Sequence, residues 1–157
     1  MKERFMIAVT AIVLAVILIQ TGVESEAISY LSDDPKACVN CHNMRAAYNS
    51  WQHSSHGRDT TCNSCHVPHD SIIKKYYFKG MDGLRHATMF TLELGPQNPI
   101  LNEGAVEVVQ ANCVRCHSKT LGALNHQNTE QRPCWECHPS VPHGKLRSIS
   151  SSIERSQ

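Results

Sequence analysis

The chain has 157 residues, a formal net charge of +1 at pH 7 and charged residues at 18% of its positions. This length suffices for one small domain. The balanced charge, without a basic stripe or a phosphate-binding glycine loop, argues against a nucleic-acid-binding protein. Aromatic residues make up only 6% of the chain, whereas it holds 8 cysteines and 10 histidines. This composition predicts a small side-chain core and a function that depends on cysteine and histidine chemistry.

The N-terminus holds an uncharged, mostly apolar run at residues 5–23, preceded by Lys2 and Arg4. A helix over this run would rise about 28 Å, close to the roughly 30 Å of membrane hydrocarbon. The basic end is expected to stay in the cytoplasm, with the rest of the chain outside. A cleaved signal peptide is the alternative, because Ser25-Glu26-Ala27 resembles a weak cleavage site. The run is longer than most signal cores, so we favour a retained anchor at residues 1–27.

Every cysteine belongs to one of four Cys-x-x-Cys-His units. The units contain Cys38 and Cys41, Cys62 and Cys65, Cys113 and Cys116, and Cys134 and Cys137, followed by His42, His66, His117 and His138 respectively. This signature is typical of covalent haem attachment. Four disulfides and zinc sites are the alternatives, but neither explains the four histidines. We predict four covalently bound c-type haems, which would form the core of the domain.

The four units are spaced short, long, short along the chain. This spacing indicates two haem pairs, at residues 38–70 and 113–143, within a haem domain at residues 28–147. Val67-Pro68-His69 after the second unit is echoed by Val141-Pro142-His143 after the fourth, which favours an internal duplication. Residues 148–157 are polar and rich in serine, and we predict a tail there.

The histidines outside the units are candidates for the second axial position of a low-spin haem. Of His53 and His56, we expect one to be a ligand and the other a bystander. His143 lies too close to His138 to serve the same haem easily, so it is expected to reach another one. Two others, His69 and His126, are predicted to have surface or hydrogen-bonding roles, and His86 is considered below with the quinol candidates.

The first unit differs from the others because Met44 lies two residues after His42. A methionine sulfur is also a known haem ligand. Two side chains therefore compete for one face of one iron, and the residues alone leave the choice open.

The segment after the second unit predicts an amphipathic helix that ends at Gly95-Pro96. Its apolar residues are Ile72, Ile73, Tyr76, Tyr77, Met81 and Leu84, with Lys74, Lys75, Lys79 and Arg85 among them. Such a basic, partly aromatic helix is typical of a membrane surface, and an ordinary half-buried helix is the alternative. A short helix is predicted at residues 105–112, before the third unit.

Lys79, Asp82 and His86 lie three and four residues apart, near one face of the predicted helix. A cation, a carboxylate and an imidazole in this arrangement could bind a quinol and accept its two protons. A simple ion pair between neighbouring turns is the alternative.

The anchor, the four units paired short-long-short and the extended first unit Cys-x-x-Cys-His-x-Met resemble the NapC/NirT family of membrane-anchored quinol dehydrogenases. Residues 51–56, Phe78-Lys79 and residues 141–145 are most similar to members that form the small subunit of a cytochrome c nitrite reductase. The resemblance implies a mainly α fold with much irregular structure: one transmembrane helix and a small haem-packed domain. It also implies a single-pass protein of the bacterial inner membrane, with this domain in the periplasm.

The resemblance further implies a set of iron ligands. Met44, in place of His42, would bind the first iron. The second haem would be shared by His66 and His143, and the third by His117 and His56. The fourth would take His138 and a lysine from the catalytic nitrite reductase subunit. His53, His69 and His126 would be bystanders.

In the family, a lysine that matches Lys79 belongs to the quinol site beside the first haem. Some members carry an aspartate seven residues later, where this chain has His86, and the nearest acid is Asp82. The sixth position of the first haem therefore stays open between empty, water and His86. We predict oxidation of menaquinol from the membrane pool and electron transfer to a multihaem nitrite reductase that forms ammonia. The alternatives are a passive carrier tethered to the lipid bilayer, and a quinol dehydrogenase for another periplasmic reductase such as nitrate reductase.

Overall fold

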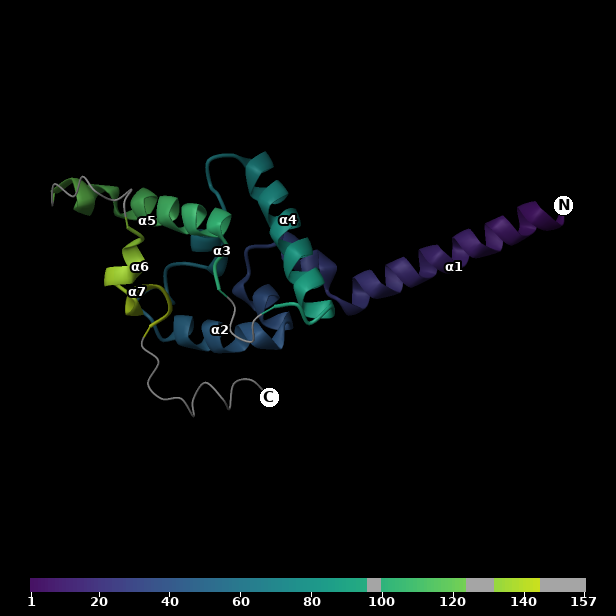
Figure 1. Cartoon of the computed structure of the whole chain (residues 1–157), viewed down its shortest axis with the longest axis horizontal. Helices are drawn as coiled ribbons and strands as arrows, with labels where there is room; N and C mark the ends of the chain where they lie inside the picture. The colour runs from purple at the N-terminus through teal and green to yellow at the C-terminus, as the bar shows by residue number, and fades with distance from the viewer. Residues whose placement is uncertain (96–99, 124–131, 145–157) are drawn as a thin grey trace. The chain divides into compact units, whose positions relative to one another are not determined.

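The computed structural model describes residues 1–95, 100–123 and 132–144, except for the side chain of His42. Within these residues the chain is helical and has no strand (Figure 1). The α-helices are α1 (Lys2–Glu24), α2 (Arg45–Gln52), α3 (Cys62–His66), α4 (Ile72–Thr91), α5 (Glu103–Ala123), α6 (Cys134–Cys137) and α7 (Ser140–His143). The 3-10 helices η1 (Ala27–Leu31), η2 (Pro35–Asn40) and η3 (His42–Met44) precede α2. The predicted fold class, mainly α with much irregular structure, is confirmed.

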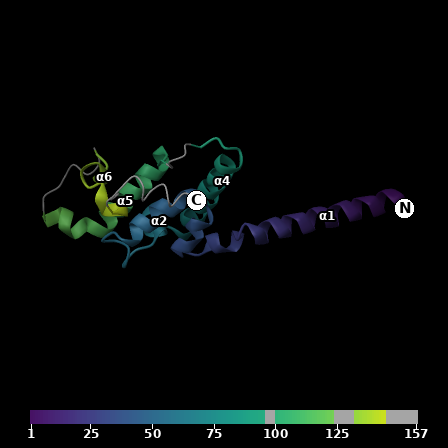
Figure 2. The same cartoon turned by 90° about the horizontal axis from the view of Figure 1, so that it is seen from below.

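The chain divides into two compact units, and the first is Met1–Ser32. Its main element, α1, is one unbroken helix (Figure 2). Among the described residues, α1 is the one helix long and apolar enough to cross a membrane, as the anchor requires. The helix ends where the Ser25 N–H donates to the Thr21 carbonyl and Glu26 turns to a left-handed φ of 49°. The domain bounds stay a prediction, and the tail lies outside the described residues.

The second unit, which begins at Asp33, has a thin side-chain core. Among its described residues, the buried apolar ones are Ala37, Val67, Ala105 and Val109. No large side chain there is completely buried. A domain of this size needs more apolar contact than these four residues supply, in agreement with the expected haem-packed interior.

Helix α4 has two lysines that face its own unit, whereas most of its large apolar side chains are exposed. The side chains of Lys75 and Lys79 are only 18% and 12% exposed. By contrast, Ile73 and Leu84 are 80% and 64% exposed. The helix ends at Thr91, where Leu92 caps it and Glu93 adopts a left-handed φ of 53°. The predicted stop at Gly95-Pro96 is therefore wrong by one turn.

Helix α5 is longer than the predicted 105–112 segment, because it runs through the whole third unit. Its first turn is capped by Asn102, whose side-chain oxygen accepts a hydrogen bond from the Ala105 N–H at 2.9 Å. Cys-Val-Arg-Cys-His contains no proline or glycine, so nothing in it stops helix propagation. Helix α3 packs against α5, and α2 packs against α7.

Candidate haem-binding and quinol sites

The four Cys-x-x-Cys-His units lie in different local structures. The first spans η2 and η3, the second is α3, the third lies inside α5, and the fourth begins in α6. All eight cysteines are free thiols, so the units are not paired as disulfides. No group of three or more histidine, cysteine or acidic side chains converges on a metal site within the described residues.

Units that follow one another along the chain also lie next to each other in space. A hydrogen bond with Cys62 lowers the pKa of the Cys38 thiol to about 7, so the first two units touch. Burial, and next the nearby Cys134 of the fourth unit, raise the pKa of Cys113 to about 11. Burial also raises the pKa of Cys65, as does Cys116 of the third unit. The units therefore form a continuous series from first to fourth.

His66 of the second unit faces His143 of α7. The two ring centres are 6.0 Å apart, and the ring planes are inclined to each other by 30°. Burial, and next the neighbouring His143, lower the pKa of His66 to about 4. Burial also lowers the pKa of His143. Both imidazoles are therefore neutral at neutral pH, as a metal ligand must be.

His117 of the third unit faces His56, which follows α2. Their ring centres are 6.1 Å apart, and the rings are perpendicular. The Nδ1 atom of His56 lies 2.9 Å from the Val141 carbonyl oxygen. A carbonyl can only accept, so Nδ1 carries the hydrogen and Nε2 keeps a free lone pair. Such an outer hydrogen bond is what orients a metal-binding histidine.

Both histidine pairs have the separation that haem iron requires. A metal–nitrogen bond of about 2 Å on each side puts the centres of two opposed imidazoles roughly 6 Å apart. The pairs His66–His143 and His56–His117 meet this condition. The residues present thus fit an iron held between the two rings of each pair.

The histidines expected to be bystanders bond within their own segments. His53 Nδ1 donates to the Asn49 carbonyl at 2.7 Å. The Nε2 atom of His69 donates to the Asn63 carbonyl at 3.0 Å. His126 lies outside the described residues. His138 ends α6, where its backbone N–H donates to the Cys134 carbonyl.

Helix α5 holds the second and fourth units beside the third through three polar side chains. Asn112, only 5% exposed, donates from its amide nitrogen to the carbonyls of Cys65 and Val67, at 2.9 and 2.8 Å. These carbonyls flank His66. Arg115 donates to the Ser64 carbonyl at 3.2 Å, and Gln110 accepts from the Cys134 N–H at 3.0 Å. These three residues could not be predicted from the sequence, because each polar side chain alone is typical of an ordinary helix surface.

Two glycines follow the outer histidines of the two pairs. A Cβ at Gly57, next to His56, would lie 2.6 Å from the Trp51 carbonyl oxygen. Gly144, next to His143, has a φ of 75°, and a Cβ there would meet the Ser50 carbonyl at 2.9 Å. Glycine is thus needed at both positions, and it lets each histidine segment approach the backbone around α2.

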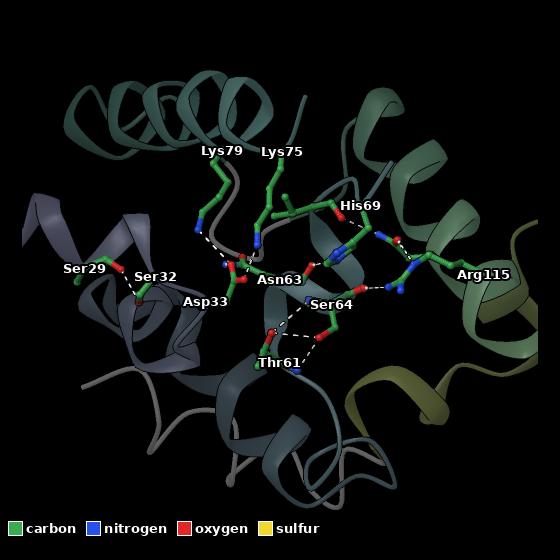
Figure 3. A network of polar contacts seen from close by, with 12 residues as sticks. Ser29, Ser32, Asp33, Thr61, Asn63, Ser64, His69, Lys75, Lys79 and Arg115 are labelled. Atoms are coloured by element: carbon green, nitrogen blue, oxygen red, sulfur yellow. Dashed lines mark hydrogen bonds and ion pairs between the residues drawn. The ribbon is translucent and has the colours of Figure 1, made fainter. Parts of the chain in front are cut away.

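The quinol candidate Lys79 lies near the first unit, where it binds Asp33. Its Nζ is 3.4 Å from an Asp33 carboxylate oxygen and 5.8 Å from the centre of the Tyr76 ring. Its ammonium contributes to the lowered pKa of Cys38, after the hydrogen bond from Cys62. Lys75 pairs with the other oxygen of Asp33 (Figure 3). Asp33 was missed from sequence, although an acid between the anchor and the first unit could have suggested a partner for the basic helix.

Asp82 and His86 form a separate contact on the same helix. Their side chains lie 3.4 Å apart, and Asp82 also accepts from Asn102 at 3.4 Å. Arg85 approaches the same carboxylate at 4.0 Å. Both members of the pair influence the pKa of His66, after burial and His143. The three candidates thus divide into Lys79 by the first unit and the Asp82–His86 pair within reach of the second.

Comparison with known proteins identifies the family. Residues 1–94 match the NapC/NirT cytochrome c family, N-terminal region. The chain belongs to this family. It is 39% identical to the cytochrome c-type protein NrfH of Wolinella succinogenes, over 96% of this chain and 93% of that protein. It is 32% identical to the cytochrome c nitrite reductase subunit NrfH of Nitratidesulfovibrio vulgaris, over 76% of this chain and 74% of that one.

A solved structure supports the same assignment. A chain in the crystal structure of the cytochrome c nitrite reductase NrfHA complex bound to the HQNO inhibitor has a TM-score of 0.65 and 28% identity. The match covers 93% of this chain and 96% of that one. Family membership implies that the protein carries covalently bound c-type haem, in agreement with the prediction from the Cys-x-x-Cys-His units. The N-terminal helix α1 fits the membrane anchor of such a protein.

Proposed function

We propose that this protein is the membrane-anchored tetrahaem small subunit of a cytochrome c nitrite reductase. It oxidises menaquinol at the outer face of the bacterial inner membrane and passes the electrons to a periplasmic catalytic subunit. The observation that supports this proposal most strongly is the similarity along almost the whole chain. The chain is 39% identical to an NrfH protein over 96% of the length of this chain. The related chain from the NrfHA complex matches a similar share of this chain, 93%.

The proposed iron ligands are those implied by the family. His66 with His143 and His56 with His117 serve the second and third haems, and the ring separations of 6.0 and 6.1 Å support this assignment. Met44 serves the first haem in place of His42. His138 serves the fourth, whose other ligand is a lysine of the catalytic subunit. When bound, the haems supply the one-electron redox changes along this series.

The quinol site is proposed beside the first unit, with Lys79 against a quinol oxygen. Its ammonium stabilises the negative charge that develops there as a proton leaves. Each quinol gives up two electrons and two protons to become a quinone. The electrons enter the haem series, and the Asp82–His86 pair passes the protons toward periplasmic water. Three quinols supply the six electrons that reduce one nitrite to ammonia.

Helix α4 is proposed to rest on the bilayer, where the quinol arrives. Its exposed residues Ile73, Tyr77 and Leu84 are apolar, and each has well over half of its surface open. Lys75 and Lys79 face the other way, toward Asp33. An apolar outer face of this kind favours the membrane-surface interpretation over an ordinary half-buried helix.

Rapid mixing with a menaquinol analogue tests the proposal. The purified complex should show haem reduction on mixing, and Lys79→Leu should slow it with haem content unchanged. Lys74→Leu is the matched control, because Lys74 lies on the same helix but pairs with Asp70 at 2.5 Å. Equal rates in the wild type and Lys79→Leu would remove Lys79 from the site. Failure of the wild-type complex to oxidise the quinol at all would favour a passive carrier.

The partner is tested separately by co-purification. A nitrite-reducing multihaem protein should co-purify with the chain from detergent extracts. Isolation with a nitrate reductase instead would keep the quinol chemistry and change the partner.

A further inference from the structure

The carboxylate of Asp33 joins three segments of the haem domain. We propose that Asp33 is a positioning residue of the quinol site, which holds the Lys79 ammonium in place beside the first haem unit. This inference rests on the proposed function, because it concerns the same site.

The contacts converge on both carboxylate oxygens of Asp33 (Figure 3). One oxygen accepts from the Asn63 amide at 2.8 Å and lies 3.4 Å from Lys79 Nζ. The other oxygen binds Lys75 Nζ. Asn63 lies inside the second Cys-x-x-Cys-His unit, and both lysines lie on α4. The carboxylate thus ties α4 to the second unit at a point just before the first.

Charge and burial explain why this carboxylate matters. The Lys75 and Lys79 side chains are 18% and 12% exposed, whereas Asp33 is 44% exposed. Two largely covered ammonium groups repel each other, and an anion between them offsets this repulsion. Each oxygen of Asp33 faces one ammonium group, so the carboxylate fixes the position of the Lys79 charge. A charge held in this position can stabilise a quinol oxygen that is losing its proton.

The role of Asp33 is to hold the Lys79 ammonium in position. It does not accept a proton from the quinol. The hydrogen bond from Lys75, with help from Asn63 and Lys79, lowers the pKa of Asp33 to about 2. The carboxylate therefore stays ionised at any pH at which the protein works. In the oxidation of quinol to quinone, the two electrons go to the haem series and the two protons leave through other groups. Asp33 neither gains nor loses a proton in this step.

The neighbouring Asp34 does not duplicate this arrangement. Its side chain accepts from the Lys36 N–H at 2.9 Å and caps the N-terminus of η2. Asp70 offers a better control, because it also pairs with a lysine of α4, at 2.5 Å. It is 54% exposed, similar to Asp33, and its partner Lys74 is not a proposed site residue.

The test compares Asp33→Asn with Asp70→Asn in the full-length haem-loaded complex. Two measurements are made: the rate of haem reduction by a menaquinol analogue, and the binding affinity for HQNO. Asp33→Asn is expected to lower both by about tenfold, the usual effect of losing one charge-assisted contact. Asp70→Asn is expected to change neither. Haem content and dithionite-reduced spectra should match the wild type in both variants.

A double-mutant cycle separates positioning from other effects. If Asp33 acts by holding Lys79, Asp33→Asn should have no further effect in a Lys79→Leu background. An undiminished effect there would overturn the inference. Wild-type behaviour of Asp33→Asn, with Lys79→Leu impaired, would also overturn it and leave the proposed function intact. Wild-type quinol kinetics in both single variants would instead remove the proposed quinol site itself.

A second variant covers the case in which Asp33→Asn fails to assemble with haem. Asp33→Glu keeps the negative charge but moves it by one methylene. It is expected to retain haem and to bind HQNO with an affinity between the wild type and Lys79→Leu. Wild-type affinity in Asp33→Glu would show that the position of the charge is unimportant and would overturn the inference.

Discussion

The first haem unit and the two central units have the same sequence signature but are held in different ways. The first lies in the short 3-10 helices η2 and η3 and is flanked by the partly exposed charge cluster of Asp33. The second and third lie in α3 and α5, which are joined by the buried amide of Asn112. The signature sets the chemistry of attachment, and the surroundings set how rigidly each unit is held.

The difference has a physical basis. 3-10 helices have poorer hydrogen bonds than α-helices and are used in short pieces. Exposed charge pairs contribute little to stability, whereas a buried amide that satisfies two carbonyls is costly to lose. The central units are thus suited to fixed iron–histidine geometry. The first unit suits a place where a substrate must enter and leave.

Gly57→Ala should have the largest effect on the central region. The new Cβ would lie 2.6 and 2.7 Å from the backbone oxygens of Trp51 and Gln52, so the backbone after α2 must move. We expect a loss of about 3 kcal/mol in unfolding free energy. His56 precedes this glycine, so the spectrum of one low-spin haem should change as well. Chemical denaturation and electron paramagnetic resonance measure the two effects.

Gly122→Ala is the matched control for Gly57→Ala. Among the described residues outside its own stretch of helix, no atom lies within 4 Å of a Cβ at Gly122, which lies within α5. Alanine should stabilise the helix by about 0.5–1 kcal/mol, because glycine loses more backbone freedom on folding. Similar stabilities for the two variants would contradict the tight packing inferred around His56.

Asn112→Ala should have the next largest effect. It leaves the buried carbonyls of Cys65 and Val67 without their donor, which we expect to cost about 2 kcal/mol. The carbonyls flank His66, so the reduction potential of one haem should shift, as measured by redox titration. Gln110→Ala removes one bond to the fourth unit and should leave the second haem unchanged. An unaltered titration in Asn112→Ala would mean that α5 does not orient His66.

Much of this molecule could be predicted from the sequence, because its strongest signals are local. The apolar N-terminal helix and c-type haem follow from runs and spacings of a few residues, whereas the bounds of the anchor and the individual attachment residues stay predictions. The partners of His56 and His143 followed only from the family resemblance, since the residues left those choices open. The Asp33, Gln110 and Asn112 contacts join segments 24 to 47 positions apart, and no local pattern marks them.

The two helix boundaries that differ from prediction have local causes. Gly95-Pro96 predicts the end of α4, because proline cannot continue a helix. The helix instead ends at Thr91, since Glu93 adopts a left-handed conformation. The segment at residues 105–112 was expected to stop before the third unit. It continues to Ala123 because haem attachment residues are compatible with an α-helix.

A substitution at Met44 tests which side chain binds the iron of the first haem. We expect this substitution to have only a small effect on stability. Met44 ends η3 and is only partly buried, so Met44→His should change the unfolding free energy by no more than about 1 kcal/mol. If Met44 binds the first iron, Met44→His should abolish the methionine–iron signature in magnetic circular dichroism. His42→Ala should leave that signature unchanged. The reverse pattern would assign the iron to His42.

The smallest expected effect is the pH dependence of the Asp33 cluster. The hydrogen bond from Lys75 lowers the pKa of Asp33 from its ordinary 3.8 to about 2. The folded protein therefore binds this proton more weakly than the unfolded chain does. The stability that Asp33 contributes is complete above pH 3.8 and is lost as the pH falls toward 2. Because the cluster is partly exposed, its contribution should stay below about 1 kcal/mol.

Thermal unfolding of the wild type and Asp33→Asn across this pH range checks the prediction. The difference between their Tm values should be constant from about pH 8 to 5 and should shrink below pH 3.8. The same difference should be smaller at every pH in a Lys75→Gln background, because the main partner is then absent. A difference as large as that of Asn112→Ala would mean that the first unit is held as firmly as the central ones. The proposed difference between an adaptable first unit and rigid second and third units would then be wrong.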